Sequence, residues 1–184
     1  MNRRSQRHID KIREINPHYW VFCEGETEEA LVCYFRAKFR ISIEIVSKIA
    51  GNSITQRFIS DYKKGKPTHK KDMDFMLYDA DESTTLAKLN KIDAKLLFSN
   101  PCIELWFLLH YKNQTGSLST QECFRELKSR NKSYKKGSID RALKEKLDSN
   151  VEEACRRAKK LILHENPSSN IFEFIEILNN AKHG

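Results

Sequence analysis

The chain has 184 residues and a net charge of +8, with 33 lysines and arginines against 25 aspartates and glutamates. This length suits one domain with a hydrophobic core, and its ten phenylalanines, six tyrosines and two tryptophans exclude a disordered chain. The sequence has no apolar run of about 18 residues that could span a membrane, and its charged first 17 residues lack the apolar segment of a secretion signal. We therefore expect a cytoplasmic protein that does not enter the membrane.

Four short apolar segments in the first hundred residues predict strands, because their length and composition match buried or half-buried strands. They are residues 19–23, 41–45, 75–78 and 95–98. Helical patterns separate and follow them, at residues 27–39, 53–62, 83–92 and 100–111. This alternation predicts an α/β fold, with a mostly parallel sheet of about four strands and helices on both faces.

Local signals mark where these helices begin. Thr27 and Ser53 are suitable N-cap residues for the first two helices. Asn100 with Pro101 predicts the start of the fourth, since proline is favoured at a first helical position.

The strand pattern fades after Ser119, and only helical faces follow. They lie around residues 123–127, 139–147, 151–162 and 171–178, with an interruption at 166–169. We expect residues 1–112 to form the α/β core and residues 113–184 a helical region packed on it.

The charge is distributed unevenly. Residues 63–71 hold five lysines and no acid, residues 112–164 hold fourteen basic and seven acidic side chains, and residues 72–111 hold three basic and seven acidic ones. A basic surface attracts polyanions such as nucleic acid. Lys70 and Lys71 in the first basic segment, and Lys135 and Lys136 in the second, are candidate contacts to a phosphate backbone. The alternative is that these lysines belong to ordinary solvated surfaces.

Polar side chains follow three of the predicted strands. Glu24 ends the first, Asp79 and Asp81 end the third, and Asn100 ends the fourth. Ligands of open parallel sheets bind beyond the carboxyl ends of the strands. Two carboxylates two residues apart favour capture of Mg²⁺, and Glu24 can complete that site or act as an acid or base. The alternative is that these acids cap helices.

Two further polar residues lie in the predicted helix at 100–111. Glu104 is surrounded by apolar residues and needs a partner, which can be Asn100 four residues earlier. Otherwise Glu104 faces a substrate. His110 is either a C-terminal cap or packed side chain, or a proton-transfer or phosphate-contact group. The five cysteines form no CxxC pair, and neither Cys23 nor Cys102 has an adjacent base, so we expect reduced thiols without nucleophilic chemistry.

Several motifs resemble those of the RloB-like family, in the same order. They are CEGETE at 23–28, YDAD at 78–81, SNPCIELWFLLH at 99–110, YKK at 134–136 and NPSS at 166–169. The resemblance extends from about Trp20 to the last helix, and the motif at 99–110 is the most specific.

That family is similar to Toprim domains, in which a glutamate follows the first strand and an Asp-x-Asp pair follows a later one. The resemblance implies that Asp79 and Asp81 hold Mg²⁺ or Mn²⁺, with Glu24 binding the metal or serving as general acid or base. The candidate site also includes Glu28, Asn100, Glu104 and His110, for which we expect supporting or substrate-facing roles.

RloB-like genes lie in restriction or abortive-infection loci, often beside an ATPase, so the resemblance also implies anti-phage defence with an AAA- or ABC-type partner. We expect a Mg²⁺-dependent nuclease acting on DNA or RNA. The sequence is compatible with an oligomer. The alternatives are a non-catalytic nucleic-acid or nucleotide-binding module that works with the ATPase, and a primase-like nucleotidyl transferase.

Overall fold

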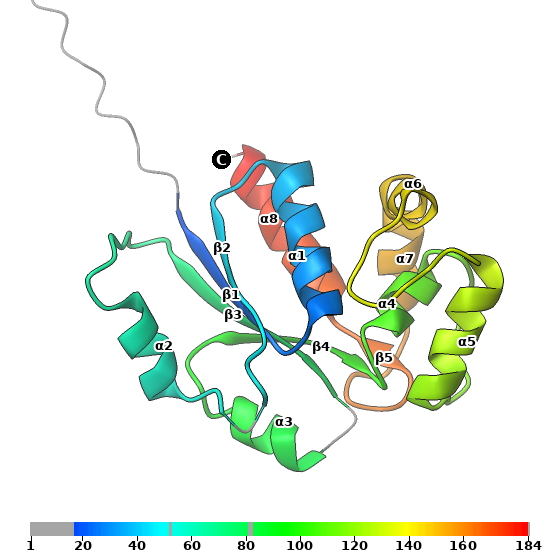
Figure 1. The fold of residues 1–184 in the computed structure, drawn as a ribbon, viewed down its shortest axis with the longest axis horizontal. Coiled ribbons are helices and arrows are strands. Elements are labelled where there is room, and N and C mark those ends of the chain that lie inside the picture. Colours follow the sequence, from blue (N-terminus) through cyan, green and yellow to red (C-terminus); the bar gives the residue numbers. More distant parts are fainter. Residues whose placement is uncertain (1–16, 52, 81–82, 184) are drawn as a thin grey trace, which may run out of the picture.

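The computed structural model describes residues 17–51, 53–80 and 83–183 (Figure 1). Its sheet has the order β2-β1-β3-β4-β5. The strands are β1 (Tyr19–Cys23), β2 (Ile43–Val46), β3 (Met73–Asp79), β4 (Lys95–Asn100) and β5 (Ser168–Ser169). The first four run parallel and β5 pairs antiparallel with β4. The predicted α/β fold with a mostly parallel sheet is confirmed, and β5 is an addition from the segment expected to be an interruption.

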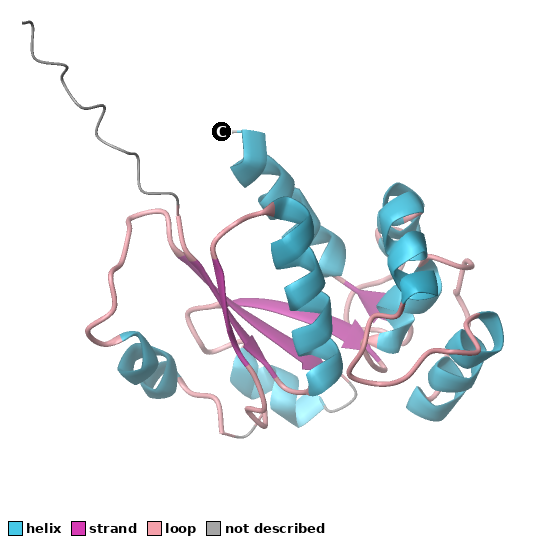
Figure 2. Ribbon diagram, turned by 45° about the horizontal axis from the view of Figure 1, so that its top comes forward, coloured by secondary structure: helices cyan, strands magenta, loops and turns pink. Residues whose placement is uncertain are grey.

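Helices cover both faces of the sheet, as Figure 2 shows. α1 (Glu26–Phe39) and α8 (Ile171–His183) lie on one face, and α2 (Gln56–Lys63) and α3 (Ser83–Leu89) on the other. Alternation within the central strands produces this layering, because successive side chains point to opposite faces. In β1, Val21 packs on the α1 side and Phe22 on the α2 side.

The C-terminal part of the chain contributes to the main hydrophobic cluster. On α8, the ring of Phe174 lies 4.7 Å from that of Phe75 in β3 and 5.8 Å from that of Phe35 in α1. This cluster therefore includes residues from both sides of the boundary expected at residue 112.

The short helix α4 (Glu104–Leu109) is buried on every side. It is enclosed by α5 (Thr120–Arg130) and α7 (Val151–Ala158), which lie with α6 (Arg141–Ser149) beyond the β4–β5 side of the sheet in Figure 1. This enclosure explains its uniformly apolar composition, since a helix that is hydrophobic all round must be buried.

Three of the predicted helix starts are wrong. Gly25, not Thr27, is the N-cap of α1. Thr55, not Ser53, caps α2, and its hydroxyl oxygen accepts from the backbone N–H of Phe58 at 3.1 Å. The fourth helix begins at Glu104 because Asn100 extends β4 by pairing with Ser168 of β5. No helix in the described part of the chain has the length and apolarity needed to cross a membrane.

Candidate functional site

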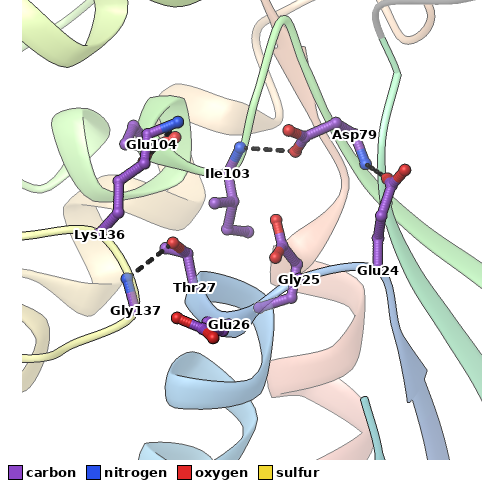
Figure 3. A pocket seen from close by; sticks show the side chains of 10 residues that line it. Glu24, Gly25, Glu26, Thr27, Asp79, Ile103, Glu104, Lys136 and Gly137 are labelled. Atoms are coloured by element: carbon purple, nitrogen blue, oxygen red, sulfur yellow. Dashed lines mark hydrogen bonds and ion pairs between the residues drawn. The ribbon is translucent and has the colours of Figure 1, made fainter. Parts of the chain in front are cut away.

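An acidic pocket of about 300 Å³ opens at the carboxyl ends of β1 and β3 (Figure 3). It is lined by Glu24, Gly25, Glu26, Thr27, Glu28, Asp79, Ile103, Glu104, Lys136 and Gly137. Five of these ten residues carry carboxyl groups and one carries an ammonium group. The lining comes from the end of β1 and the start of α1, from the end of β3, from the start of α4, and from the loop between α5 and α6.

Glu24 and Asp79 lie together in this pocket because β1 and β3 are neighbours in register, with Cys23 opposite Leu77. The backbone N–H of Asp79 lies 3.4 Å from Oε2 of Glu24, which accepts its hydrogen bond. The backbone N–H of Ile103 donates to Oδ1 of Asp79 at 2.9 Å. The structure thus brings two of the three predicted carboxylates to one place and ties Asp79 to the segment before α4.

Asp81, the third predicted carboxylate, lies outside the described residues. Within the parts of the chain that are described, no three side chains of histidine, cysteine, aspartate or glutamate form a group that could hold a metal ion.

Burial and mutual repulsion perturb the carboxyl groups of the pocket. Burial, followed by the charges of Glu28, Glu104 and Glu24, raises the pKa of Asp79 to about 8. Burial, with smaller contributions from Glu104 and Glu24, raises the pKa of Glu28 to about 7. At neutral pH the pocket therefore favours either bound protons or a cation that offsets the negative charge. Carboxylate oxygens are the ligands that Mg²⁺ prefers, so the donor chemistry fits a divalent ion.

Gly25 allows the carboxylate of Glu28 to fold back over the turn between β1 and α1. A Cβ atom at position 25 would lie only 2.8 Å from Oε2 of Glu28. Any side chain at this position would displace the carboxylate, so the glycine shapes the floor of the pocket.

Glu104 is 2% exposed and is paired within the pocket. The hydroxyl group of Tyr134 donates to Oε1 of Glu104 at 3.0 Å, and Nζ of Lys136 lies 3.9 Å from the same oxygen. Asn100, one of the partners that the sequence suggested for Glu104, belongs to β4 instead, and its side-chain amide donates to the backbone oxygen of His164 at 3.4 Å. Asn100 does not line the acidic pocket.

His110 also lies away from the acidic pocket. It is the C-cap residue of α4, and its Nδ1 hydrogen-bonds to the backbone oxygen of Trp106 at 2.9 Å. Burial lowers the pKa of His110 to about 4. The sequence left two interpretations of His110 open, a helix cap or packed side chain and a proton-transfer or phosphate-contact group. This geometry matches the first.

The loop between α5 and α6 brings Lys136 to the acidic pocket. The backbone N–H of Gly137 donates to the hydroxyl oxygen of Thr27 at 3.0 Å. Gly137 has a φ of +73°, a conformation that favours glycine. Thr27 therefore holds the loop against α1 rather than capping that helix.

The model of the RloB-like protein family matches residues 19–178. The chain belongs to the RloB-like family. No curated protein and no solved structure matches it. The match spans every element that lines the acidic pocket, including the loop that carries Lys136, so the whole pocket lies within the family region.

The other lysines predicted to contact nucleic acid occupy different places in this RloB-like chain. Lys135 is exposed and does not line the acidic pocket. Lys70 and Lys71 are exposed in the loop that leads into β3, at the amino end of that strand. Because the acidic pocket lies at the carboxyl end, Lys70 and Lys71 are at the opposite edge of the sheet.

Sequence reasoning missed three contributors to the site of this RloB-like chain, namely Glu26, Thr27 and the hydroxyl group of Tyr134. Two of them stand in the same CEGETE segment as Glu24 and Glu28, and that dense run of acids around a glycine was an available signal. Tyr134 stands in the YKK motif at 134–136, but no local pattern indicates its hydrogen bond to Glu104, which is 30 residues away in the chain.

Proposed function

We propose that this RloB-like chain is a divalent-metal-dependent phosphodiesterase of the nuclease type, with a Toprim-like core, that acts in anti-phage defence. The single observation that carries the proposal is the acidic pocket itself, where Glu24, Asp79 and Glu28 meet at the carboxyl edge of the sheet with Lys136 at its border. A pocket with perturbed carboxyl groups and a convergent cation is a candidate for phosphodiester chemistry.

The donor set suggests which residues would hold the metal. Asp79 and Glu24, together with Asp81, would bind Mg²⁺ or Mn²⁺ through carboxylate oxygens. When bound, such an ion polarises a phosphodiester oxygen and lowers the pKa of a bound water. The N–H of Ile103 orients Asp79 for this role through its hydrogen bond to Oδ1.

Two other residues of the pocket have roles that follow from their charge. Glu28 has a pKa raised to about 7, which suits a group that accepts or donates a proton near neutral pH. Lys136 is exposed over 60% of its side chain, so its ammonium group is available to a phosphate at the mouth of the pocket.

Nucleic acid is the proposed substrate, because the chain carries a net charge of +8. The partner ATPase and the defence role rest on the resemblance to RloB-like proteins of restriction and abortive-infection loci.

The test is a cleavage assay on labelled single-stranded and duplex DNA and RNA, with Mg²⁺ or Mn²⁺. Wild type is compared with Asp79→Asn and Glu24→Gln, and Asp61→Asn on the surface of α2 is the matched control. We expect EDTA, Asp79→Asn and Glu24→Gln each to abolish cleavage and Asp61→Asn to preserve it. Cleavage that survives EDTA and Asp79→Asn would refute the proposal.

A non-catalytic binding module is the second candidate. It is favoured by one observation, that residues 112–136 beside the acidic pocket carry seven basic and two acidic side chains, a charge that attracts a polyanion. This candidate predicts strong binding of nucleic acid that weakens with salt, without cleavage even when Mn²⁺ and the partner ATPase are present.

A further inference from the structure

We propose that a second pocket, on α5 beside the acidic pocket, binds an unpaired nucleobase of the substrate. The inference rests on the proposed function, since it names the class of nucleic acid that the acidic pocket would receive. We call this second pocket the α5 pocket. Its lining consists of Thr120, Gln121, Phe124 and Arg125 from α5, with Lys136 from the following loop.

Lys136 joins the two pockets, because it lines both. Its ammonium group lies 3.9 Å from Oε1 of Glu104 in the acidic pocket and 5.9 Å from the centre of the Phe124 ring in the α5 pocket. A phosphate held by Lys136 would therefore have reacting carboxylates on one side and an aromatic ring on the other. One nucleotide can reach both, with its phosphate at Lys136 and its base on Phe124.

Phe124 is a fixed stacking platform. The ring is half-buried and lies 5.8 Å from the ring of Tyr134, whose hydroxyl group is held by Glu104. A ring supported in this way keeps its orientation without a ligand, which reduces the entropy lost on binding. Nucleobases stack on such rings in proteins that bind single strands.

The other side chains of the α5 pocket complement a nucleotide. Gln121 offers both donor and acceptor atoms for a base edge, and Arg125 offers a planar cation for a base face or a phosphate. The volume of the α5 pocket, about 470 Å³, falls in the range of small-ligand pockets.

The charge of the surrounding chain points to a polyanion. Residues 112–136 carry seven basic and two acidic side chains. An acidic peptide would also match this charge, but it would make no use of a ring next to a phosphate-binding lysine. In a duplex both faces of each base are covered by their neighbours, so only a single-stranded or extruded base can stack on Phe124. The substrate class is therefore nucleic acid with unpaired nucleotides.

The test measures binding without cleavage, in EDTA, with two probes of the same sequence. One is a single-stranded oligonucleotide that contains 2-aminopurine, and the other is its duplex. Phe124→Leu keeps an apolar side chain against Tyr134 but removes the aromatic face, Phe124→Tyr keeps that face, and thermal melts check folding. The matched control is Phe58→Leu on α2, which alters a ring that packs on Phe22, on the α2 side of the sheet.

We expect Phe124→Leu to weaken single-strand binding about 10-fold, which corresponds to about 1.4 kcal/mol of stacking. Duplex binding should change less than about 2-fold, since it depends on phosphate contacts. Phe124→Tyr and Phe58→Leu should bind as wild type does, and 2-aminopurine fluorescence should be quenched on wild type but not on Phe124→Leu.

The inference is overturned if Phe124→Leu leaves single-strand binding unchanged or weakens both probes equally. It is also overturned if an acidic peptide, and not the oligonucleotide, binds in a way that depends on Phe124. The two proposals fail separately. Phe124-dependent binding without any metal-dependent cleavage rejects only the nuclease, and cleavage with no dependence on Phe124 rejects only the stacking site.

Discussion

Asp79→Asn should make the protein more stable at pH 8, even though it removes a residue proposed to be essential for activity. Asp79 is buried among other carboxyl groups, which raise its pKa to about 8 in the folded state. In the unfolded chain the pKa of an aspartate is about 3.9. The folded protein therefore binds more protons than the unfolded chain between about pH 4 and pH 8, and this group's contribution to stability is lost as the pH rises through that window.

The size of the effect follows from these two pKa values. Each pH unit in the window shifts the free energy of unfolding by up to about 1.4 kcal/mol. Glu28 and Glu24 share the repulsion, so we expect Asp79→Asn to gain about 2 to 4 kcal/mol at pH 8 and almost nothing at pH 4. The asparagine oxygen can still accept from the N–H of Ile103, so the hydrogen bond at that end of the pocket is kept.

Thermal and urea unfolding followed by circular dichroism, in EDTA at several pH values from 4 to 8, measure this gain. For a chain of this size it corresponds to a rise in Tm of roughly 5 to 15 °C at pH 8. Asp61→Asn is again the control and should show no pH-dependent gain. Added Mg²⁺ should raise the Tm of wild type more than that of Asp79→Asn, because a bound cation offsets the repulsion. If Asp79→Asn is no more stable than wild type at pH 8 in EDTA, the argument from buried, mutually repelling carboxylates is refuted.

Three further predictions concern the surrounding structure. His110→Gln should reduce the loss of folding stability at low pH. Burial lowers the pKa of His110 to about 4 from an unfolded value near 6.5, so the wild-type protein loses about 3 kcal/mol of stability as the pH falls through that window. If urea titrations show the same pH dependence for the variant and the wild type, this reasoning is contradicted. Tyr134→Phe should lower the free energy of unfolding by about 1 to 3 kcal/mol, because buried Glu104 loses a hydrogen bond. In a double-mutant cycle, Tyr134→Phe should cost less in a protein that already carries Glu104→Gln. Phe174→Ala should cost about 3 to 5 kcal/mol in urea unfolding, because its ring is fully buried, and half-buried Phe172→Ala should cost clearly less if that reasoning holds.

The central strands were readable from local sequence. Residues 19–23 and 75–78 are continuous apolar runs because their strands lie inside a parallel sheet with both faces covered. The acids that follow them were predicted to share one edge, and Glu24 and Asp79 do lie together there. This succeeded because parallel strands place their carboxyl ends on the same side whatever their order.

Interactions between distant segments were not readable. Thr27 looked like a helix cap, yet its hydroxyl accepts from Gly137, 110 residues away. β5 consists of two serines with no strand pattern, and it exists because the edge of β4 offers Ser99 and Asn100 as partners.

The amino-acid sequence by itself therefore determined the α/β alternation, the two-sided burial of the strands and the placing of acids at strand ends, because each depends on near neighbours in the chain. Only the tertiary structure decided the rest of the site. In the folded chain Glu104 accepts a hydrogen bond from Tyr134, and Lys136 lies at the acidic pocket and beside Phe124. Lys70 and Lys71 lie at the opposite edge of the sheet from that pocket. These positions depend on how the helices after residue 112 pack around α4. The net charge of +8 does not say which lysines face the carboxyl groups of the acidic pocket.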